Sequence, residues 1–335
     1  MHSFINSNNN YHFSKFDDED LKAYLLFLRN YYIDYRDKLR VDNKTLFGLE
    51  IEYECSPEER IEVDNYIKNY AFYESKDEKD FDYGMGGEIV TPILNNSSNN
   101  WKNIKNICKK LKELNVNTEN RSGAHVHIGA HILSDLNKFK QFLLLYSAYE
   151  SIIYRFSNGE YITGRFNQYS CAYPISLTLI DSMDKILDSQ DFTDIERILS
   201  WTNRFYGLNL KNVNYDNIGA CKYKNTIEFR MANGTDEEII WQNIVNLYCK
   251  LIESSRDKEF DIDYLKYKII KFKNRNSYSF FDHLDIRGAL ELSDIIFDNN
   301  LDKSNFIRQY IKDGVDLTKL KDRPFDIKSS LFIKK

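Results

Sequence analysis

Apolar residues near the start of the chain recur with the spacing of an α-helix. An acidic stretch at 17–20, which is favourable at a helix N-terminus, precedes them. The apolar positions follow one another at intervals of four and three residues: Leu21, Leu25, Leu28, Tyr32, Tyr35 and Leu39. We therefore predict an amphipathic helix over 17–40, which packs on its own domain or binds a partner. Residues 1–16 are rich in Asn and Ser, and we expect them to be disordered.

Further along, polar and apolar residues alternate in several segments, which is the pattern of a β-strand. The predicted strands lie at 45–54, 86–92, 123–132, 218–223 and 226–232. Helices are expected between and after them, starting at Ser56, covering 101–114, running from Ser134 to about 156, lying near 180–205, and running from Asp236 to about 254. From 257 onward the sequence is helical and charged, so we predict a helical C-terminal extension over 257–335.

Composition narrows the class of protein. The chain has 335 residues, 42% of them hydrophobic, which is typical of a packed globular protein. Its net charge of -5 argues against a surface built to bind nucleic acid. Its five cysteines are scattered and suggest neither a disulfide framework nor a four-cysteine zinc site. No leader or membrane span is recognisable, so we expect a cytoplasmic protein.

The predicted strands share an unusual polar face. Alternation puts three acids of the first strand on one side, opposite strictly apolar neighbours. The later strands add two imidazoles, an acid with an arginine, and one further acid on their polar sides. The residues concerned are Glu50, Glu52, Glu54, Glu88, His125, His127, Glu228 and Arg230.

Such a cluster of acids needs compensating positive charge. Like charges about 4 Å apart repel by roughly 4 kcal/mol at an effective dielectric constant near 20. Carboxylates with one or two imidazoles and no thiolates favour Mg²⁺ or Mn²⁺ over structural zinc. Taken singly, each motif has a simpler explanation: a solvated strand face, structural histidines or a surface ion pair. The apolar opposite face of every segment favours a metal site.

The same segments resemble a known family. FGLEIEYE, GGEIVTPIL, SGAHVHIG, RFYGLNL and NTIEFRMANGT, in this order and spacing over about 45–254, resemble the amidoligases. These are a branch of the glutamine synthetase and glutamate-cysteine ligase superfamily. The resemblance implies an α+β fold with a glutamine synthetase-like, curved, mainly antiparallel sheet and helices packed behind it. It also implies that 17–256 form the catalytic domain and that the concave face of the sheet binds ATP and divalent metal ions.

The resemblance further implies roles for individual residues. Glu50, His125 and Glu228 would hold one metal ion, and Glu52 with Glu88 would hold another. Arg230 would contact the transferred phosphoryl group, which makes Arg230 and Glu228 the expected catalytic residues. Asn209 and Arg165 match two further positions of the family. They would line the nucleotide pocket together with Arg230. Whether Glu54 and His127 are also ligands is left open.

The function implied is an ATP- and Mg²⁺- or Mn²⁺-dependent ligase that forms an amide, as a peptide or isopeptide bond, through an acyl phosphate. Its carboxylate and amine substrates would be small molecules, peptides or proteins. A homo-oligomer could use the first helix and the C-terminal extension.

Two alternatives stay open. One is a zinc-dependent hydrolase that uses His125 and His127 as metal ligands. The other is a non-catalytic binding protein that uses a basic strip over 266–275, made of Lys266, Lys268, Lys271, Lys273 and Arg275.

Overall fold

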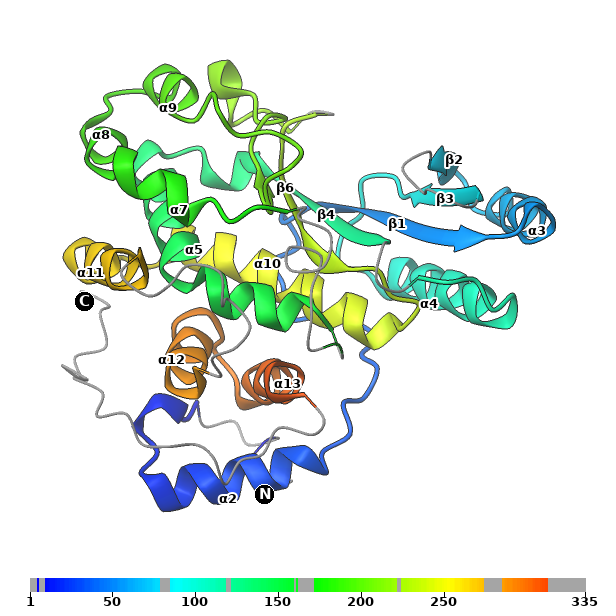
Figure 1. Cartoon of the computed structure of the whole chain (residues 1–335), viewed down its shortest axis with the longest axis horizontal. Helices are drawn as coiled ribbons and strands as arrows, with labels where there is room; N and C mark the ends of the chain where they lie inside the picture. Colours follow the sequence, from blue (N-terminus) through cyan, green and yellow to red (C-terminus); the bar gives the residue numbers. More distant parts are fainter. Residues whose placement is uncertain are drawn as a thin grey trace.

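The chain folds around one antiparallel β-sheet (Figure 1). The computed structural model describes residues 5, 10–78, 85–118, 122–159, 161, 172–221, 224–273 and 285–312. Within them the sheet has six strands in the order β2-β3-β1-β4-β6-β5. The strands are β1 Phe47–Cys55, β2 Glu74–Glu78, β3 Met85–Val90, β4 Gly123–Gly129, β5 Leu208–Asn209 and β6 Thr226–Asn233. The fold is therefore α+β, as expected.

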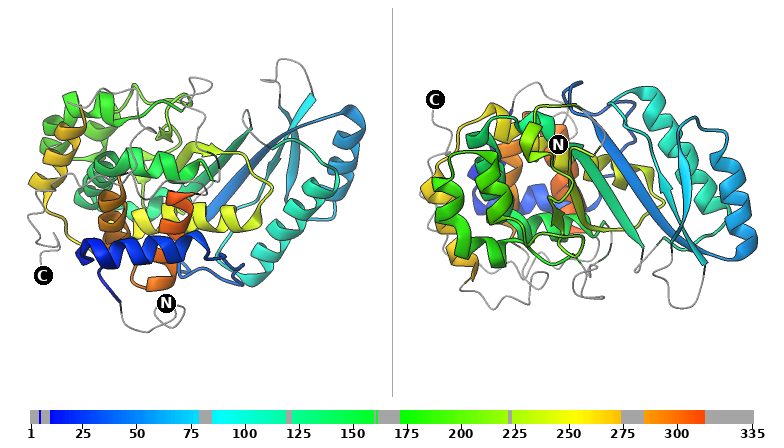
Figure 2. Two further views of the ribbon diagram at one scale, coloured as in Figure 1. Left: turned by 60° about the horizontal axis from the view of Figure 1, so that its bottom comes forward. Right: turned by 90° about the horizontal axis from the view of Figure 1, so that it is seen from above.

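Helices cover one face of the sheet and build further layers beyond it. The longer ones are α2 Asp18–Arg29, α3 Pro57–Ile67, α4 Ser98–Glu113, α5 Leu136–Ser157, α10 Glu238–Asp257, α11 Ile262–Lys273, α12 Ile286–Ile296 and α13 Asn300–Ile311. Short helices follow α5 at α7 Ser176–Leu179, α8 Met183–Asp188 and α9 Phe192–Ile198. Both views of Figure 2 show α3 and α4 side by side next to the β1–β3 end of the sheet.

Aromatic contacts join the covering helices to the apolar face of the sheet. On β6, Phe229 stacks on Tyr248 of α10 with ring centroids 4.2 Å apart. On β1, Phe47 stacks on Trp101 of α4 at 5.5 Å. These rings are buried, and so are the residues of β1 that face the helices. Because aromatic and aliphatic burial is the largest stabilising contribution, this packing fixes the orientation of β1 and β6.

The register of the strands confirms the predicted polar face. Glu50 lies opposite His125, and Glu52 lies opposite Glu88. On the other side of β4, His127 lies opposite Glu228. Residues directly opposite each other in an antiparallel pair share a face of the sheet. The polar residues of four strands therefore lie together, with the helices behind them.

The first helix is shorter than predicted. Asp17 caps α2 as the acidic start suggests, and Leu21, Leu25 and Leu28 are buried, but the helix ends at Arg29. Side chains from distant segments take over the backbone hydrogen bonds of the following stretch. Gln242 accepts from the amide of Arg36 at 3.0 Å, and Asn96 accepts from the amide of Leu39 at 3.0 Å. These tertiary contacts override the helical spacing, and Tyr32 is left 75% exposed.

Both predicted terminal segments contribute to the packed structure. The expectation of disorder is wrong for residues 10–16, where Phe13 is fully buried and its amide donates to Asp294 of α12 at 3.0 Å. In the predicted C-terminal extension, α12 and α13 pack against α5 and α10. Residues 1–4, 6–9 and 313–335 lie outside the described part of the chain.

Two smaller expectations also need correction. Residues 218–221 form no strand, and the strand that pairs with β6 on its outer side is instead β5, through Asn209 opposite Glu228. The N-cap of α5 is Asp135, not Ser134, because the Asp135 carboxylate accepts from two backbone amides of the first turn. Among the described helices, none combines the length and apolar character that crossing a bilayer requires.

A buried acid on α5 gives the fold a pH dependence. Glu150 accepts hydrogen bonds from the backbone amides of Ile175 and Ser176 at 2.8 and 2.9 Å. Burial raises the pKa of Glu150 to about 7, against the bonds to Ser176 and Ile175, which lower it. Since the ordinary value is 4.5, the unfolded chain loses this proton at lower pH than the folded protein.

We therefore expect the free energy of unfolding to fall as pH rises from about 4.5 to about 7, by about 3 kcal/mol in total from this group, and to level off above that. Urea unfolding across this range should show the fall in the wild-type protein. The part of this fall that comes from Glu150 should be missing in Glu150→Gln, because the amide does not titrate. Parallel pH profiles for the two proteins would contradict the assignment.

Candidate functional site

Glu50, at the middle of β1, is the centre of the polar face. Its Oε2 lies 3.1 Å from Nδ1 of His125, and its Oε1 lies 3.0 Å from Nε2 of His127. The two imidazoles alternate along β4, so they flank Glu50 from the neighbouring strand. One carboxylate therefore contacts two rings, one with each oxygen.

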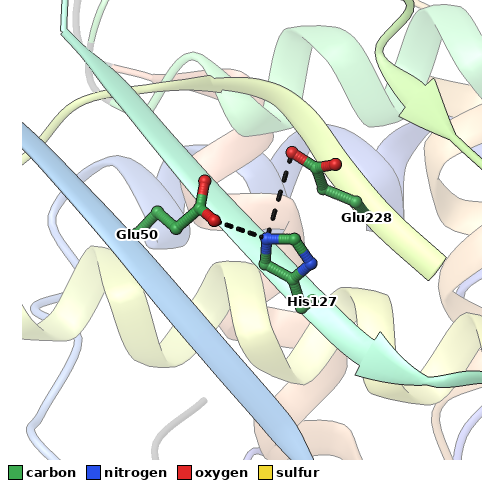
Figure 3. A group of neighbouring side chains, drawn as sticks. All are labelled: Glu50, His127 and Glu228. Carbon is green, nitrogen blue, oxygen red and sulfur yellow. Dashed lines mark hydrogen bonds and ion pairs between the residues drawn. The ribbon is translucent and has the colours of Figure 1, made fainter. Parts of the chain in front are cut away.

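Glu228, on β6, closes one side of this arrangement (Figure 3). Its Oε1 lies 3.9 Å from Nε2 of His127, and this oxygen also forms a close ion pair with Arg230. Its Oε2 accepts a hydrogen bond from Nδ2 of Asn209 at 2.6 Å. Glu228 is 3% exposed, so these partners fix the orientation of a buried carboxylate.

Glu52 and Glu88 occupy the other side. Glu52 accepts a close hydrogen bond from the amide of Gly123, and its Oε1 lies 3.4 Å from Nε2 of His125. Glu88 is held opposite Glu52 on β3. Gly87 makes that placement possible: a Cβ there would lie 2.1 Å from Arg60 Nη1 and 2.3 Å from the Tyr53 hydroxyl. Only glycine leaves room for both side chains behind the strand.

Among the described residues, two groups of side chains on this face could each hold a metal ion. One is Glu50, His127 and Glu228, and the other is Glu50, Glu88 and His125, each with ligand atoms within 4.8 Å of one another. The donors are carboxylates and one imidazole per group, which suits Mg²⁺ or Mn²⁺. Glu50 belongs to both groups, and it contacts the imidazole of each through a different oxygen.

Hydrogen bonds and opposite charges within the cluster shift the pKa values of its members. Burial raises the pKa of Glu50, but hydrogen bonds and charges from His125 and His127 outweigh it and hold the pKa well below its ordinary value. For His127, burial lowers the pKa, but the contacts with Glu50 and Glu228 outweigh it and raise the pKa. Burial likewise lowers the pKa of Arg230, and Glu228 more than offsets this. A metal ion on His127 would compete with a proton for the ring.

The structure brings most of the predicted site together but distributes the histidines differently. The imidazole beside Glu228 is that of His127, whereas His125 lies with Glu88 and Glu52. His127, whose role was left open, is thus a candidate ligand. Glu54 belongs to neither group, and its Oε2 accepts from Asn117 at 3.4 Å, at the rim.

Of the remaining residues predicted for the site, some lie next to Glu228 and one is not described. Asn209 and Arg230 both contact Glu228 directly. Arg165 lies outside the described residues. Sequence reasoning missed Thr226, whose hydroxyl lies 3.2 Å from Nδ1 of His127 and fixes that ring from behind. In the sequence, Thr226 precedes Glu228 by two residues on the same strand, and this spacing could have identified it as part of the polar face.

Comparison with known proteins gives one family. The family model described as "Putative amidoligase enzyme" matches residues 18–252, well over half of the chain. A search among curated proteins found no match.

The shared position of Glu50 leads to a prediction about metal binding. Glu50→Gln removes a charge from both groups, so we expect Mn²⁺ binding to weaken at both. Glu88→Gln affects only the group with His125, so the stoichiometry should fall from two ions to one. Calorimetric and paramagnetic resonance titrations with Mn²⁺ would measure both. Glu54→Gln, a rim carboxylate on the same strand, is the matched control and should still bind two ions. Equal behaviour of all three variants would rule out the arrangement.

Proposed function

The chain belongs to the amidoligase family, and we propose that it is an ATP- and Mg²⁺-dependent ligase that joins a carboxylate to an amine with release of ADP and phosphate. The single observation that carries this proposal is the carboxylate of Glu50 shared by two metal-capable groups, with Arg230 beside one of them. Phosphoryl transfer needs divalent cations on the phosphate oxygens and a cationic donor at the moving group. The polar face offers ligands for such cations and the guanidinium of Arg230 within one set of strands.

The architecture is consistent with a glutamine synthetase-like catalytic domain. All the acids lie on one face of an antiparallel sheet, and α3, α4, α5 and α10 pack behind it. In the proposed site this leaves the polar face free for nucleotide and substrate. The apolar face and its helices would keep the ligands from moving during the reaction.

In the proposed reaction an oxygen of the substrate carboxylate attacks the γ-phosphorus of ATP, and the bond from that phosphorus to the bridging oxygen of ADP breaks. The amine nitrogen then attacks the acyl carbon, phosphate leaves, and the amine loses a proton. Bound divalent ions would neutralise charge on the phosphate oxygens. Glu50, Glu88, Glu228 and the two imidazoles would hold those ions.

Arg230 would contact the phosphoryl group as it moves. Its side chain is 20% exposed, and its present partner Glu228 would turn to the metal. A planar guanidinium suits the oxygens of a transferring phosphoryl group. Asn209 would keep Glu228 oriented through the hydrogen bond to Oε2.

The alternatives have less support. A zinc hydrolase would use His125 and His127 on one ion, but these imidazoles lie in separate groups, each with two carboxylates. In the basic strip, Lys266 pairs with Asp184 at 2.8 Å and Lys268 with Glu291. Two of its five cations are therefore already neutralised, and Lys273 and Arg275 have no described side chain.

The proposal is tested by nucleotide release. ADP and phosphate should be released in the presence of Mg²⁺ when pools of amino acids and peptides are supplied. Mass spectrometry should then find a product whose mass is the sum of two pool members minus one water. Tight stoichiometric zinc and no nucleotide binding would favour the hydrolase instead.

Arg230→Gln should lower kcat by about 10²- to 10³-fold, because a transition-state donor is removed, with a smaller change in KM for ATP. Arg230→Lys should restore part of the rate. Arg197→Gln is the matched control, since the Arg197 side chain is 74% exposed on α9. A near-normal kcat for Arg230→Gln would exclude the assigned role.

A further inference from the structure

A cavity of about 330 Å³ lies between α13 and the segment that follows α2. α13 packs on α2 and on α10, and Figure 1 shows α10 between these two helices and the sheet. The cavity is therefore on the other side of a helical layer from the polar face. Its volume is within the usual range for sites that bind small molecules.

Asn305 of α13 brings a buried amide without a partner to this cavity. The residue is 2% exposed, and its Oδ1 has no hydrogen-bond partner among the described residues. A buried acceptor left without a donor is destabilising, so such atoms are rare in folded proteins. An asparagine amide also carries the donor Nδ2 beside this acceptor. Asn305 therefore suits a ligand that presents a donor next to an acceptor.

Arg36 lines the same cavity but is not a free cation. Its Nη1 pairs with Asp302 at 2.6 Å, and its Nη2 donates to Oδ1 of Asn243 at 2.8 Å. Because Asp302 neutralises the guanidinium, Arg36 does not favour a phosphate or a carboxylate in the cavity. Its Nε is buried and has no acceptor in the part of the chain that the structure describes. This N–H is one further donor for an uncharged ligand.

An exposed ring and an exposed acid border the cavity. Tyr32 is 75% exposed, and Asp34 is exposed as well. Aromatic rings at protein surfaces stack on nucleobases. Carboxylates accept hydrogen bonds from ribose hydroxyls. Tyr32 and Asp34 therefore match the base and the sugar of one ligand.

We propose that this cavity binds a nucleoside with adenine as its base. Asparagine binds adenine through two hydrogen bonds, in which Oδ1 accepts from the N6 amino group and Nδ2 donates to N7. Guanine presents two acceptors at the same edge, which would leave Oδ1 of Asn305 without a donor. Tyr32 stacks on the base, and Asp34 accepts from the ribose. This site is additional to the ATP site proposed on the polar face and does not depend on it.

The first test titrates adenosine and purine riboside, which lacks the N6 amino group, into the protein calorimetrically. The wild-type protein should bind adenosine about 10- to 100-fold more tightly, because purine riboside offers no donor to Oδ1 of Asn305. Asn305→Leu keeps a similar volume without the amide and should lose this preference. A preference that survives in Asn305→Leu would place adenosine elsewhere, such as on the polar face, and would overturn the proposal.

A second variant leaves the buried amide in place. Tyr32→Ala removes a ring that is 75% exposed, so the fold should be kept. Adenosine should then bind about 5- to 100-fold more weakly, because stacking on the base is lost. Tyr267→Ala, at a position of α11 that is 51% exposed, is the matched control and should bind adenosine as wild type does. No adenosine binding by the wild-type protein, or equal affinity in Tyr32→Ala, would refute the site.

Discussion

The concentration of carboxylates on one face of a β-sheet is the constraint on which the rest of the structure depends. Repulsion between unpaired acids at these separations would cost several kcal/mol per pair. Each central acid therefore has a donor: Glu50 contacts two imidazoles, Glu52 a backbone amide, and Glu228 both Asn209 and Arg230. This compensation keeps the acids in place without removing their capacity to bind cations.

The packing of the apolar face offsets the energetic cost of gathering these acids. Tyr248 and Trp101 stack on rings of β6 and β1, and the inward side chains of these strands are almost completely buried. Burial of this kind contributes about 25 cal/mol per Å² and depends on β1 and β6 keeping their register. Because side chains alternate, a slip by one residue would put Glu50 into the core. The same packing that stabilises the fold thus holds the acids together.

The sequence predicted the polar face because period-two alternation determines which side chains share a side. It did not predict β2, since Glu74–Glu78 is a charged edge strand with no apolar alternation, held by Arg60 from a helix. It also placed the helix end wrongly, because Gln242 and Asn96 bind the backbone after Arg29 from far along the chain. Which imidazole lies beside Glu228 depends on the position of β6 next to β4, which spacing within one strand does not reveal.

The charge of the site sets an order on the proposed reaction. Its substrates, a nucleoside triphosphate and a carboxylate, are anions, and the face that receives them is acidic. Arg230 is already paired with Glu228, so it cannot attract both substrates alone. Glu50, Glu88, Glu228 and the two imidazoles would hold cations that offset this negative charge, and Glu228, when it binds a cation, would release Arg230. In this scheme the carboxylate substrate would bind after the cations, because only then would the face attract it.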